Sequence, residues 1–302
     1  MITPPPLKQG DTIGIVAPAR KVDKHEIESA IKVFESWGLY IIFGKNLLNA
    51  FGQFSGTDKD RAEDLQYMLD DPNIKAIICA RGGYGTIKTL PYLDFSRLLK
   101  KPKWIVGYSD ITALHAHLNQ NLGIKSIHGI MPLNFPANSS ENNATQSLKK
   151  TLFGSNSTYK FNNHPFNKTG VAKSTIVGGN LSVLYSIAGT KYDLDTHHKI
   201  LFLEDLDEYL YHIDRMMMNL KFGGKLEKLK GLIVGGMTKM NDNQTPYGQT
   251  AYEIIRDAVA EYHFPVCYNF PAGHIENNLA LVLGNKITLE VSEQMTTVKF
   301  VD

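Results

Sequence analysis

The sequence predicts an α/β protein with two domains. Through residues 11–130, short apolar segments rich in β-branched residues alternate with amphipathic segments at helical spacing. This alternation favours a parallel sheet covered by helices on both faces. Near the C-terminus, apolar and polar residues alternate one by one, as antiparallel strands require. The chain has 302 residues, which is long for a single hydrophobic core, so two domains are expected.

Composition and charge indicate a soluble globular protein. Hydrophobic residues make up 43% and charged residues 21%, and the formal net charge of +2 gives no reason to expect nucleic acid or a membrane as partner. The two cysteines, Cys79 and Cys267, are too few for a disulfide framework or a cysteine zinc site. We find no signal-peptide pattern and no window long enough to span a membrane. We therefore expect a cytoplasmic protein.

The first half contains strands and helices in turn. We expect strands at 11–18, 40–43, 74–80, 104–106 and 124–130. A first helix begins after Asp23, with Glu26 placed as in a capping box, and ends at Gly38. A second begins at Thr57–Asp60, and a third follows residue 112.

The composition shifts at about Asn134, where residues rich in Asn, Ser, Lys and Gly begin, with one helix expected near Asn143–Leu152. We therefore expect a first domain over 1–150, a linker over 151–172 and a second domain over 173–302. In the second domain, strands are expected at 199–203, 229–234, 266–270, 287–291 and 297–301. Helices are expected at 213–220 and 250–262.

Ser109 lies where an apolar strand turns into a helix. Trp104–Val106 forms the strand, Gly107 breaks it, and the helix starts at Thr112. A serine in such a turn points its hydroxyl out of the sheet edge, where an acyl-transfer enzyme holds its nucleophile. The match to a G-x-S-x-G elbow is partial because Ile111 replaces the second glycine. The alternative is a serine that only caps the helix.

Ser109, Glu204 and His274 share one placement, since each follows an apolar strand at its carboxyl end, where open α/β sheets bind ligands. A serine nucleophile needs a base, and the base needs a carboxylate that fixes its tautomer. The order serine, glutamate, histidine is compatible with such a triad. Each residue also has a structural alternative: a cap, part of a solvated acidic run, and a structural histidine. A metal site in the acidic run lacks matching ligands at suitable spacing.

The loop Arg81–Gly85 is glycine-rich and follows a strand. Neither the dinucleotide fingerprint nor the lysine-bearing phosphate loop is present. Such a loop can instead offer backbone N–H groups to an oxyanion, or it can be a tight turn that needs small residues.

Together these motifs resemble the LD-carboxypeptidase family of serine peptidases, which includes murein tetrapeptide carboxypeptidases and microcin immunity peptidases. The matching pieces are Ile15–Pro18, Arg81–Gly85, Gly107–Asp110, Gly178–Leu181, Leu201–Asp205, Ile213–Arg215 and Gly273–His274.

The resemblance implies Ser109 as nucleophile, His274 as general base and Glu204 as its orienting acid. It implies an oxyanion hole from the backbone N–H groups of Gly83 and Asp110. It also implies an N-terminal parallel-sheet domain like class I glutamine amidotransferases, a smaller C-terminal β/β/α domain, and a homodimer. Two positions depart from the family pattern: Ile275 stands where Gly is frequent after the histidine, and Val282 where Pro is expected.

The leading hypothesis is a serine carboxypeptidase that needs no metal or cofactor and removes a terminal D-Ala from a murein tetrapeptide. The substrate would be a small peptide whose free carboxylate is bound by Arg81 or by the backbone of Gly82. One alternative is a microcin-type immunity peptidase of the same family that cleaves a peptidyl-nucleotide. Another is a non-catalytic two-domain ligand-binding protein.

Overall fold

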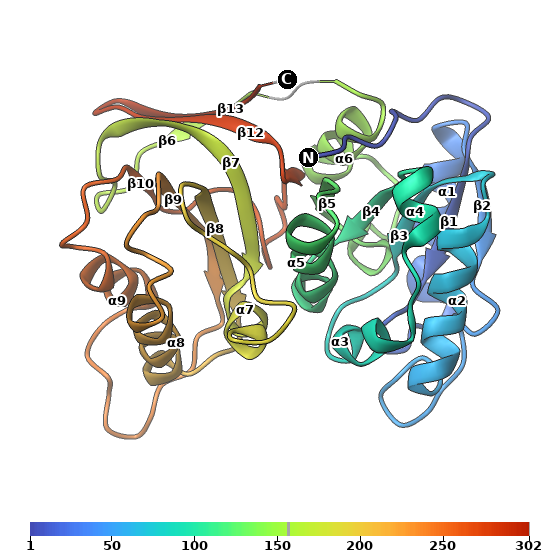
Figure 1. The fold of residues 1–302 in the computed structure, drawn as a ribbon, viewed down its shortest axis with the longest axis horizontal. Coiled ribbons are helices and arrows are strands. Elements are labelled where there is room, and N and C mark those ends of the chain that lie inside the picture. The colour runs from blue at the N-terminus through green and yellow to red at the C-terminus, as the bar shows by residue number, and fades with distance from the viewer. Residues whose placement is uncertain (156–157, 302) are drawn as a thin grey trace. The chain divides into compact units, whose positions relative to one another are not determined.

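The chain divides into two compact units in the computed structural model, which describes residues 1–155 and 158–301 (Figure 1). Unit 1 comprises Met1–Ser155 and Asn277–Val282, and unit 2 comprises Asn156–Glu276 and Leu283–Asp302. Thus a short C-terminal segment belongs to the N-terminal unit.

Unit 1 is built on a sheet whose strand order is β11-β5-β4-β3-β1-β2 in the described residues. β1 pairs in parallel with β2 and β3, β3 with β4, and β4 with β5. The strands are β1 Thr12–Val16, β2 Tyr40–Phe43, β3 Ile74–Cys79, β4 Trp104–Gly107, β5 Ser126–His128 and β11 Leu281–Leu283. The carboxyl ends of these five parallel strands, β2, β1, β3, β4 and β5, therefore lie at the same edge of the sheet.

Helices cover both faces of this sheet, as the alternating pattern predicts. Ile13 and Ile15 point to one face and share a core with Phe34 of α1 and Leu148 of α6. On the other face α2 lies so close that a side chain on Gly14 would overlap Met68. The helices are α1 Lys24–Ser36, α2 Asp58–Asp70, α3 Thr86–Thr89, α4 Ser96–Lys100, α5 Thr112–Asn121 and α6 Asn143–Leu152. Short 3₁₀ turns occur at Leu90–Tyr92, Ser109–Ile111 and Pro132–Asn134.

The helix starts follow local capping chemistry. The Glu26 carboxylate accepts the Asp23 backbone N–H at 2.7 Å before α1, and Thr57 accepts the Asp60 N–H before α2. These bonds satisfy backbone groups that the first helical turn leaves without partners. Residues at these caps are close in sequence, which is why the sequence alone locates both helices.

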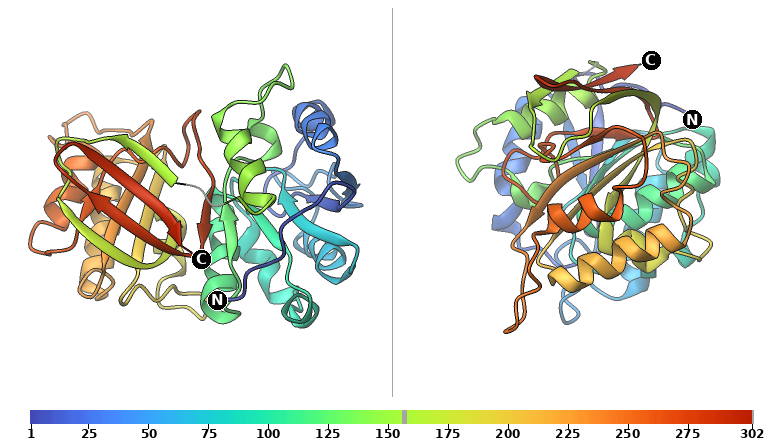
Figure 2. Two further views of the ribbon diagram at one scale, coloured as in Figure 1. Left: turned by 90° about the horizontal axis from the view of Figure 1, so that it is seen from above. Right: turned by 90° about the vertical axis from the view of Figure 1, so that its left-hand side faces the viewer.

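Unit 2 has a sheet with a parallel half and an antiparallel half, in the order β10-β9-β8-β7-β12-β13-β6 for the described residues. β7 joins the halves, because it pairs in parallel with β8 through Ile176–Asn180 and antiparallel with β12 through Gly170–Thr175. Figure 2 shows β12 and β13 as neighbouring red strands. The strands are β6 Thr158–Asn162, β7 Gly170–Asn180, β8 Ile200–Leu206, β9 Gly231–Thr238, β10 Val266–Cys267, β12 Lys286–Val291 and β13 Met295–Val301.

The helices of unit 2 follow strands of the parallel half. They are α7 Leu181–Ile187, α8 Leu210–Phe222 and α9 Ala251–Ala258. Met216 and Met217 of α8 are buried, as are Ile254 and Ile255 of α9. The two-sheet α/β architecture expected from the sequence is confirmed.

Three details differ from the sequence-based expectations. β8 does not end before the acidic run: Glu204 and Asp205 lie inside it, with a register shift against β9 between Leu203 and Asp205. The strand expected over 266–270 is only Val266–Cys267, and the helix expected over 250–262 ends at Ala258. Val259, Tyr268 and Phe270, which lie beyond these ends, are buried although they are outside the regular elements.

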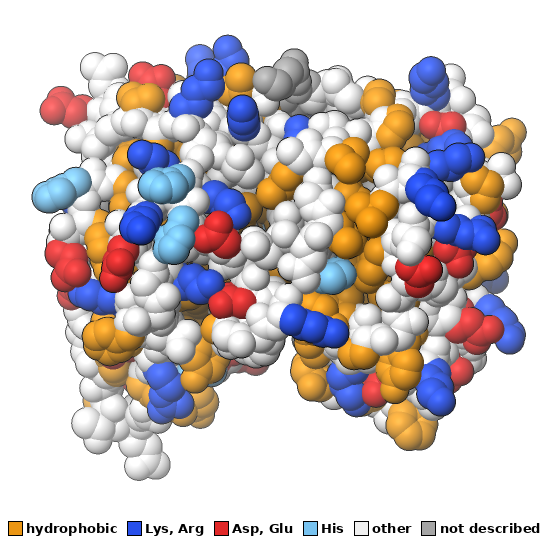
Figure 3. Space-filling model, viewed as in Figure 1, with side chains coloured by type: hydrophobic (Ala, Val, Ile, Leu, Met, Phe, Trp, Pro, Cys, Tyr) orange, Lys and Arg blue, Asp and Glu red, His pale blue; other side chains and the backbone are white. Residues whose placement is uncertain are grey.

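The range 151–172 contains strand β6 and the start of β7, and the division between the units falls after Ser155. β6 alternates exposed and half-buried side chains, so its composition resembles that of a solvated connection. No helix of the described residues has the length and apolarity needed to cross a membrane. On the face in Figure 3, basic and acidic side chains are interspersed rather than gathered by sign.

Candidate functional site

Ser109 occupies a strained turn at the carboxyl end of β4. Its backbone φ is 62°, in the left-handed region that residues other than glycine rarely adopt. It begins the 3₁₀ turn before α5, whereas the N-cap positions are Tyr108 and Ile111, neither with a side-chain cap bond. Ser109 thus occupies a strained strand-to-helix turn and neither of the two N-cap positions.

The Arg81–Gly85 loop, which follows β3, lies against this turn. A Cβ on Gly82 would sit 2.8 Å from the Ser109 Cβ and 3.1 Å from the Ser109 Oγ. Gly83 has φ 108°, a conformation that glycine adopts without strain. The sequence-based expectation that this loop lies beside Ser109 is thus met by Gly82, whose missing side chain makes the approach possible.

Asp110 anchors the Ser109 turn to the same loop. Its carboxylate accepts the Thr86 backbone N–H at 2.7 Å. Burial raises the pKa of Asp110, while the hydrogen bonds from Thr86 and the charge of Arg61 oppose the increase. The side chain of Asp110 is thereby fixed as a structural acceptor, and its backbone N–H is the group that the family resemblance places in the oxyanion hole.

A buried arginine supports the loops around Ser109. The Arg61 side chain is fully buried, and it donates to the carbonyls of Pro18 at 3.0 Å and Gly56 at 2.9 Å. It also donates to Gly85 at 3.4 Å and pairs with Asp58 at 2.6 Å. Sequence reasoning missed Arg61, because its partners are dispersed along the chain and no local motif marks them.

His115 of α5 forms a hydrogen bond with the last residue of β4. Its Nε2 lies 2.9 Å from the Gly107 carbonyl oxygen, which only accepts, so Nε2 carries the proton. Burial lowers the pKa of His115 to about 4, opposed by the Gly107 bond. The ring is therefore neutral at neutral pH, and His115 is a buried structural residue.

Glu204 and His274 meet inside unit 2. The Nδ1 of His274 donates to the Glu204 Oε2 at 2.6 Å, and the His274 backbone N–H donates to the same oxygen at 3.2 Å. The Glu204 side chain is fully buried, and that of His274 is 13% exposed. Burial alone would lower the pKa of His274, but the charge and hydrogen bond of Glu204 and the charge of Asp205 outweigh it, so the pKa is raised.

This pairing fixes the tautomer of His274. Since a carboxylate accepts, the proton sits on Nδ1, and Nε2 is the basic nitrogen of the neutral ring. The acidic run is therefore not a solvated face at this position: Glu204 is a buried carboxylate that orients an imidazole and stabilises its charged form.

Three glycines make room for the Glu204–His274 pair. A Cβ on Gly273, which has φ 108°, would lie 2.7 Å from the Glu204 Cβ and 2.8 Å from Oε2. A Cβ on Gly235 would lie 2.5 Å from the Ala272 carbonyl oxygen, and one on Gly236 would lie 2.7 Å from Ile275. The glycine pair that ends the apolar run of β9 is thus explained by close approach of the histidine loop.

Asp205, the residue after Glu204 in β8, forms hydrogen bonds with a different segment. Asp205 accepts the Asn180 side-chain amide and the Ser182 backbone N–H, both at 2.9 Å, at the start of α7. Burial, together with the charge of Glu204, raises its pKa to about 7. Asp205 thereby fixes the Gly178–Leu181 segment beside the strand that carries Glu204.

The remaining predicted residues have simpler surroundings. Arg81 donates to the Lys21 carbonyl at 3.3 Å and lies 3.8 Å from the Glu26 carboxylate. Ile275 packs against Gly236, and Val282 packs on the core of unit 1. Ser109, Asp110, Arg81, Gly82 and Gly83 thus belong to unit 1, and Glu204 and His274 to unit 2.

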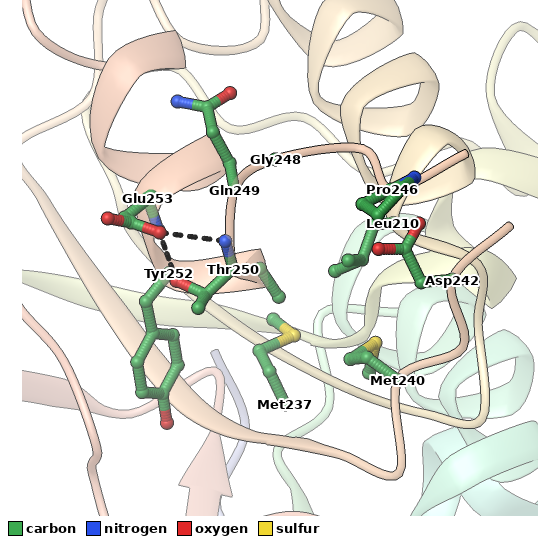
Figure 4. Close-up of a pocket in the computed structure, with 11 residues that line it drawn as sticks. Leu210, Met237, Met240, Asp242, Pro246, Gly248, Gln249, Thr250, Tyr252 and Glu253 are labelled. Atoms are coloured by element: carbon green, nitrogen blue, oxygen red, sulfur yellow. Dashed lines mark hydrogen bonds between the residues drawn. The ribbon is translucent and has the colours of Figure 1, made fainter. Parts of the chain in front are cut away.

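A cavity of about 480 Å³ lies in unit 2 near the carboxyl end of β9 (Figure 4). Leu210, Met237 and Met240 give it an apolar lining. Its acidic side chains bond locally: Asp242 accepts backbone N–H groups of the same loop, and Glu253 caps α9 with Thr250. The lining includes neither Glu204 nor His274, so we do not place the chemistry there.

Within residues 1–155 and 158–301, no group of three or more His, Cys, Asp or Glu side chains is arranged to hold a metal ion.

Comparison with known proteins identifies the family. Residues 13–129 match the LD-carboxypeptidase N-terminal domain, and residues 173–289 match the LD-carboxypeptidase C-terminal domain. The fold and these matches define a two-domain peptidase. The chain belongs to the LD-carboxypeptidase family, and it is an enzyme.

Its relatives include a probable murein peptide carboxypeptidase of Bacillus subtilis, 35% identical over 98% of this chain and 94% of that protein. The microcin self-immunity protein MccF of Escherichia coli is 26% identical over 94% of this chain and 92% of its own length. The crystal structure of muramoyltetrapeptide carboxypeptidase from Oxalobacter formigenes has a TM-score of 0.88 at 26% identity, covering 96% of this chain and 99% of that one.

The close contact at Gly273 gives a first prediction. Gly273→Ala should disturb Glu204 directly and reduce kcat about tenfold or more, because a displacement of about 1 Å can cost about 100-fold in rate. Gly248→Ala is the matched control: its φ is 88°, but a Cβ there meets nothing within 4 Å. Both variants bear the strain of a left-handed alanine, about 1–2 kcal/mol. Equal activity of the two variants would contradict the proposed crowding at Glu204.

His115 gives a pH prediction for stability. Its pKa is depressed to about 4 from an ordinary 6.5, so the unfolded chain binds more protons between these values. The stability that the neutral ring contributes is present above pH 6.5 and is lost as the pH falls towards 4, by up to about 1.4 kcal/mol per pH unit. Urea unfolding of wild type and His115→Gln from pH 7.5 to 4.5 should show a difference that shrinks on acidification. A pH-independent difference would refute the assignment.

Proposed function

We propose that this protein is a serine carboxypeptidase that hydrolyses the amide between the L-centre of a diamino acid and the terminal D-Ala of a murein tetrapeptide. The observation that carries the proposal is the buried Glu204 carboxylate bound to Nδ1 of His274, which leaves Nε2 as a base of raised pKa. Ser109, in its left-handed turn beside Gly82, supplies the nucleophile.

In the proposed mechanism Ser109 is the nucleophile and His274 is the general base. The Ser109 Oγ attacks the scissile carbonyl carbon while His274 Nε2 takes the hydroxyl proton. The N–H groups of Gly83 and Asp110 stabilise the oxyanion. Collapse breaks the C–N bond, and His274 protonates the departing D-Ala amine. Water then hydrolyses the acyl-enzyme with His274 again as base, and Glu204 stabilises the imidazolium in both steps.

The substrate class follows from the relatives named as murein peptide and muramoyltetrapeptide carboxypeptidases. We further propose a cytoplasmic homodimer with an N-terminal domain like the class I glutamine amidotransferases, as the family resemblance implies. Arg81 and the Gly82 backbone are the sequence-based candidates for binding the terminal carboxylate, because both lie on the loop that contacts Ser109.

A microcin-type immunity peptidase is the second candidate, favoured by the similarity to MccF over 94% of this chain. The two functions share the triad and differ in the leaving group. Hydrolysis of an aminoacyl sulfamoyl nucleoside in preference to the tetrapeptide would select this second function.

The triad should act as a unit. Ser109→Ala and His274→Ala should each lower kcat by about 10⁴–10⁶-fold, and the double variant should lose little more, because the residues serve one proton transfer. kcat/KM of the wild type should fall when the pH drops below the pKa of His274, because the protonated ring cannot accept the serine proton. This pKa lies above the ordinary 6.5, since the charge of Glu204 outweighs the effect of burial. Glu204→Gln should reduce kcat and move this limb to lower pH.

Steady-state kinetics across pH 5–9 measures both effects. Independent, multiplicative losses in the double variant, or an unmoved pH limb in Glu204→Gln, would show that the three residues do not form the proposed triad.

The reaction itself is tested with tetrapeptides ending in D-Ala or L-Ala. We expect release of D-Ala only, because inversion at the terminal residue displaces either its carboxylate or its methyl group. EDTA should leave the rate unchanged, since the proposed nucleophile is a serine. Released alanine is measured by mass spectrometry, with Ser109→Ala as the blank. Equal release of both enantiomers, or loss with EDTA that zinc restores, would defeat the proposal.

A further inference from the structure

Arg20 lies in the loop that follows β1, in unit 1. Its side chain is exposed, and its backbone N–H donates to the Gly82 carbonyl at 3.3 Å. An isolated antiparallel bridge with Phe54 fixes the other side of the loop. The backbone of Arg20 is thus tied to the turn that contacts Ser109.

The Arg20 side chain covers Gly83. A Cβ on Gly83 would overlap the Arg20 Cγ and Cδ, so the aliphatic part of the arginine rests on this residue. The preceding residue, Gly82, has the Ser109 side chain as its closest neighbour. Two consecutive glycines therefore contact the candidate nucleophile and an arginine, respectively, and the guanidinium begins one bond beyond Cδ.

The Arg20 guanidinium forms no ion pair with the described residues. Among the residues that the structure describes, no carboxylate lies within the 4.0 Å that defines an ion pair with it. Arg81 differs, since it lies 3.8 Å from Glu26 and donates to the Lys21 carbonyl at 3.3 Å. Of the two arginines on these adjoining loops, Arg20 is the one available to an external anion.

We propose that Arg20, and not Arg81, binds the terminal carboxylate of the substrate. This inference rests on the proposed function, in which Gly83 donates to the oxyanion. In a carboxypeptidase substrate the terminal carboxylate is three bonds from the scissile carbonyl carbon, so the two groups lie within about 4 Å of each other. The stem of Arg20 rests on Gly83, the proposed oxyanion donor, so its guanidinium follows directly beside that residue. A guanidinium binds carboxylates with two parallel hydrogen bonds.

The consequence is specificity for chain ends. A peptide with a free terminal carboxylate gains the charge-assisted bonds, whereas the same peptide with a C-terminal amide, or one continued by further residues, does not. Arg20 is thereby the residue that makes the enzyme a carboxypeptidase rather than an endopeptidase.

The test compares a tetrapeptide ending in D-Ala with its C-terminal amide. Binding is measured by calorimetry in the Ser109→Ala background, where the peptide is not consumed. The free acid should bind about 10- to 100-fold more tightly than the amide. Adding Arg20→Ala should bring this ratio close to one, and Arg20→Lys should restore part of it. Lys21→Ala, which removes the neighbouring exposed cation, is the matched control and should keep the ratio.

Several results would overturn the inference: no binding of the acid, a ratio unchanged by Arg20→Ala, or a ratio lost in Arg81→Ala instead. In the enzyme with Ser109 intact, Arg20→Ala should raise KM for the acid more than it lowers kcat. Labelling of Ser109 by a fluorophosphonate, which has no carboxylate, should keep its wild-type rate. A binding ratio that depends on Arg20 in a protein that neither cleaves the peptide nor reacts with the label would refute the proposed function and support the carboxylate site.

Discussion

The buried guanidinium of Arg61 is the interaction on which the Ser109 region depends. It binds backbone carbonyls from three separate segments: Pro18 after β1, Gly56 before α2, and Gly85 after β3. Its charge is compensated by Asp58 at 2.6 Å and by the Phe54 ring, whose centroid lies 4.7 Å away. An arginine suits this place because its five donors are fixed in one plane and its charge is permanent. Arg61 is fully buried whereas Asp58 is 30% exposed, so the backbone carbonyls supply most of the buried partners of the guanidinium.

Hydrogen bonds and close contacts connect the Arg61 side chain to the turn at Ser109. Gly85 precedes Thr86, whose N–H binds Asp110, and Asp110 is the residue after the strained Ser109. A serine held in the left-handed region persists only when its surroundings determine it, and here Asp110, Gly82 and the bond from His115 to the Gly107 carbonyl all act on the same turn. The strained backbone of Ser109 is thus held by contacts from three separate segments: the Arg81–Gly85 loop, the turn itself and α5.

The sequence predicts most of this architecture where the signal is local. Strand Tyr40–Phe43 and helix Asn143–Leu152 occur with the predicted bounds, because hydrophobic periodicity and capping residues are short-range features. The fully buried Glu204 could not be distinguished from a solvated acidic run by composition, since its burial depends on the glycines of other segments that pack around it.

The long-range contacts that hold the Ser109 region could not be predicted from the sequence either. Arg61 and His115 have partners or neighbours that only the folded chain brings near. The range 151–172 contains an edge strand, β6, whose half-exposed polar residues carry no core signal. Ser109, Glu204 and His274 became candidates through their placement after apolar strands, and the family resemblance, which draws on whole motifs, assigned a role to each. It gave no information on Arg20, which is significant only through its contact with Gly83.

The adjacent carboxylates of β8 show how one low-dielectric environment supports two functions. Successive side chains of a strand point to opposite faces, so Glu204 and Asp205 meet different partners. Asp205, with a pKa raised to about 7 by burial and then by the charge of Glu204, accepts N–H groups at the start of α7, where a helix N-terminus favours a negative charge. Glu204 instead contacts the imidazole of His274, which becomes charged when it takes up a proton.

The same burial that makes ionisation of Asp205 costly strengthens the attraction between Glu204 and protonated His274, because both effects grow as the effective dielectric constant falls. A solvated acidic run would have neither property. Burial of His274 opposes its charging, and the charge and hydrogen bond of Glu204 together with the charge of Asp205 outweigh this effect and raise its pKa. The glycines at positions 235 and 273 leave the room that Glu204 occupies.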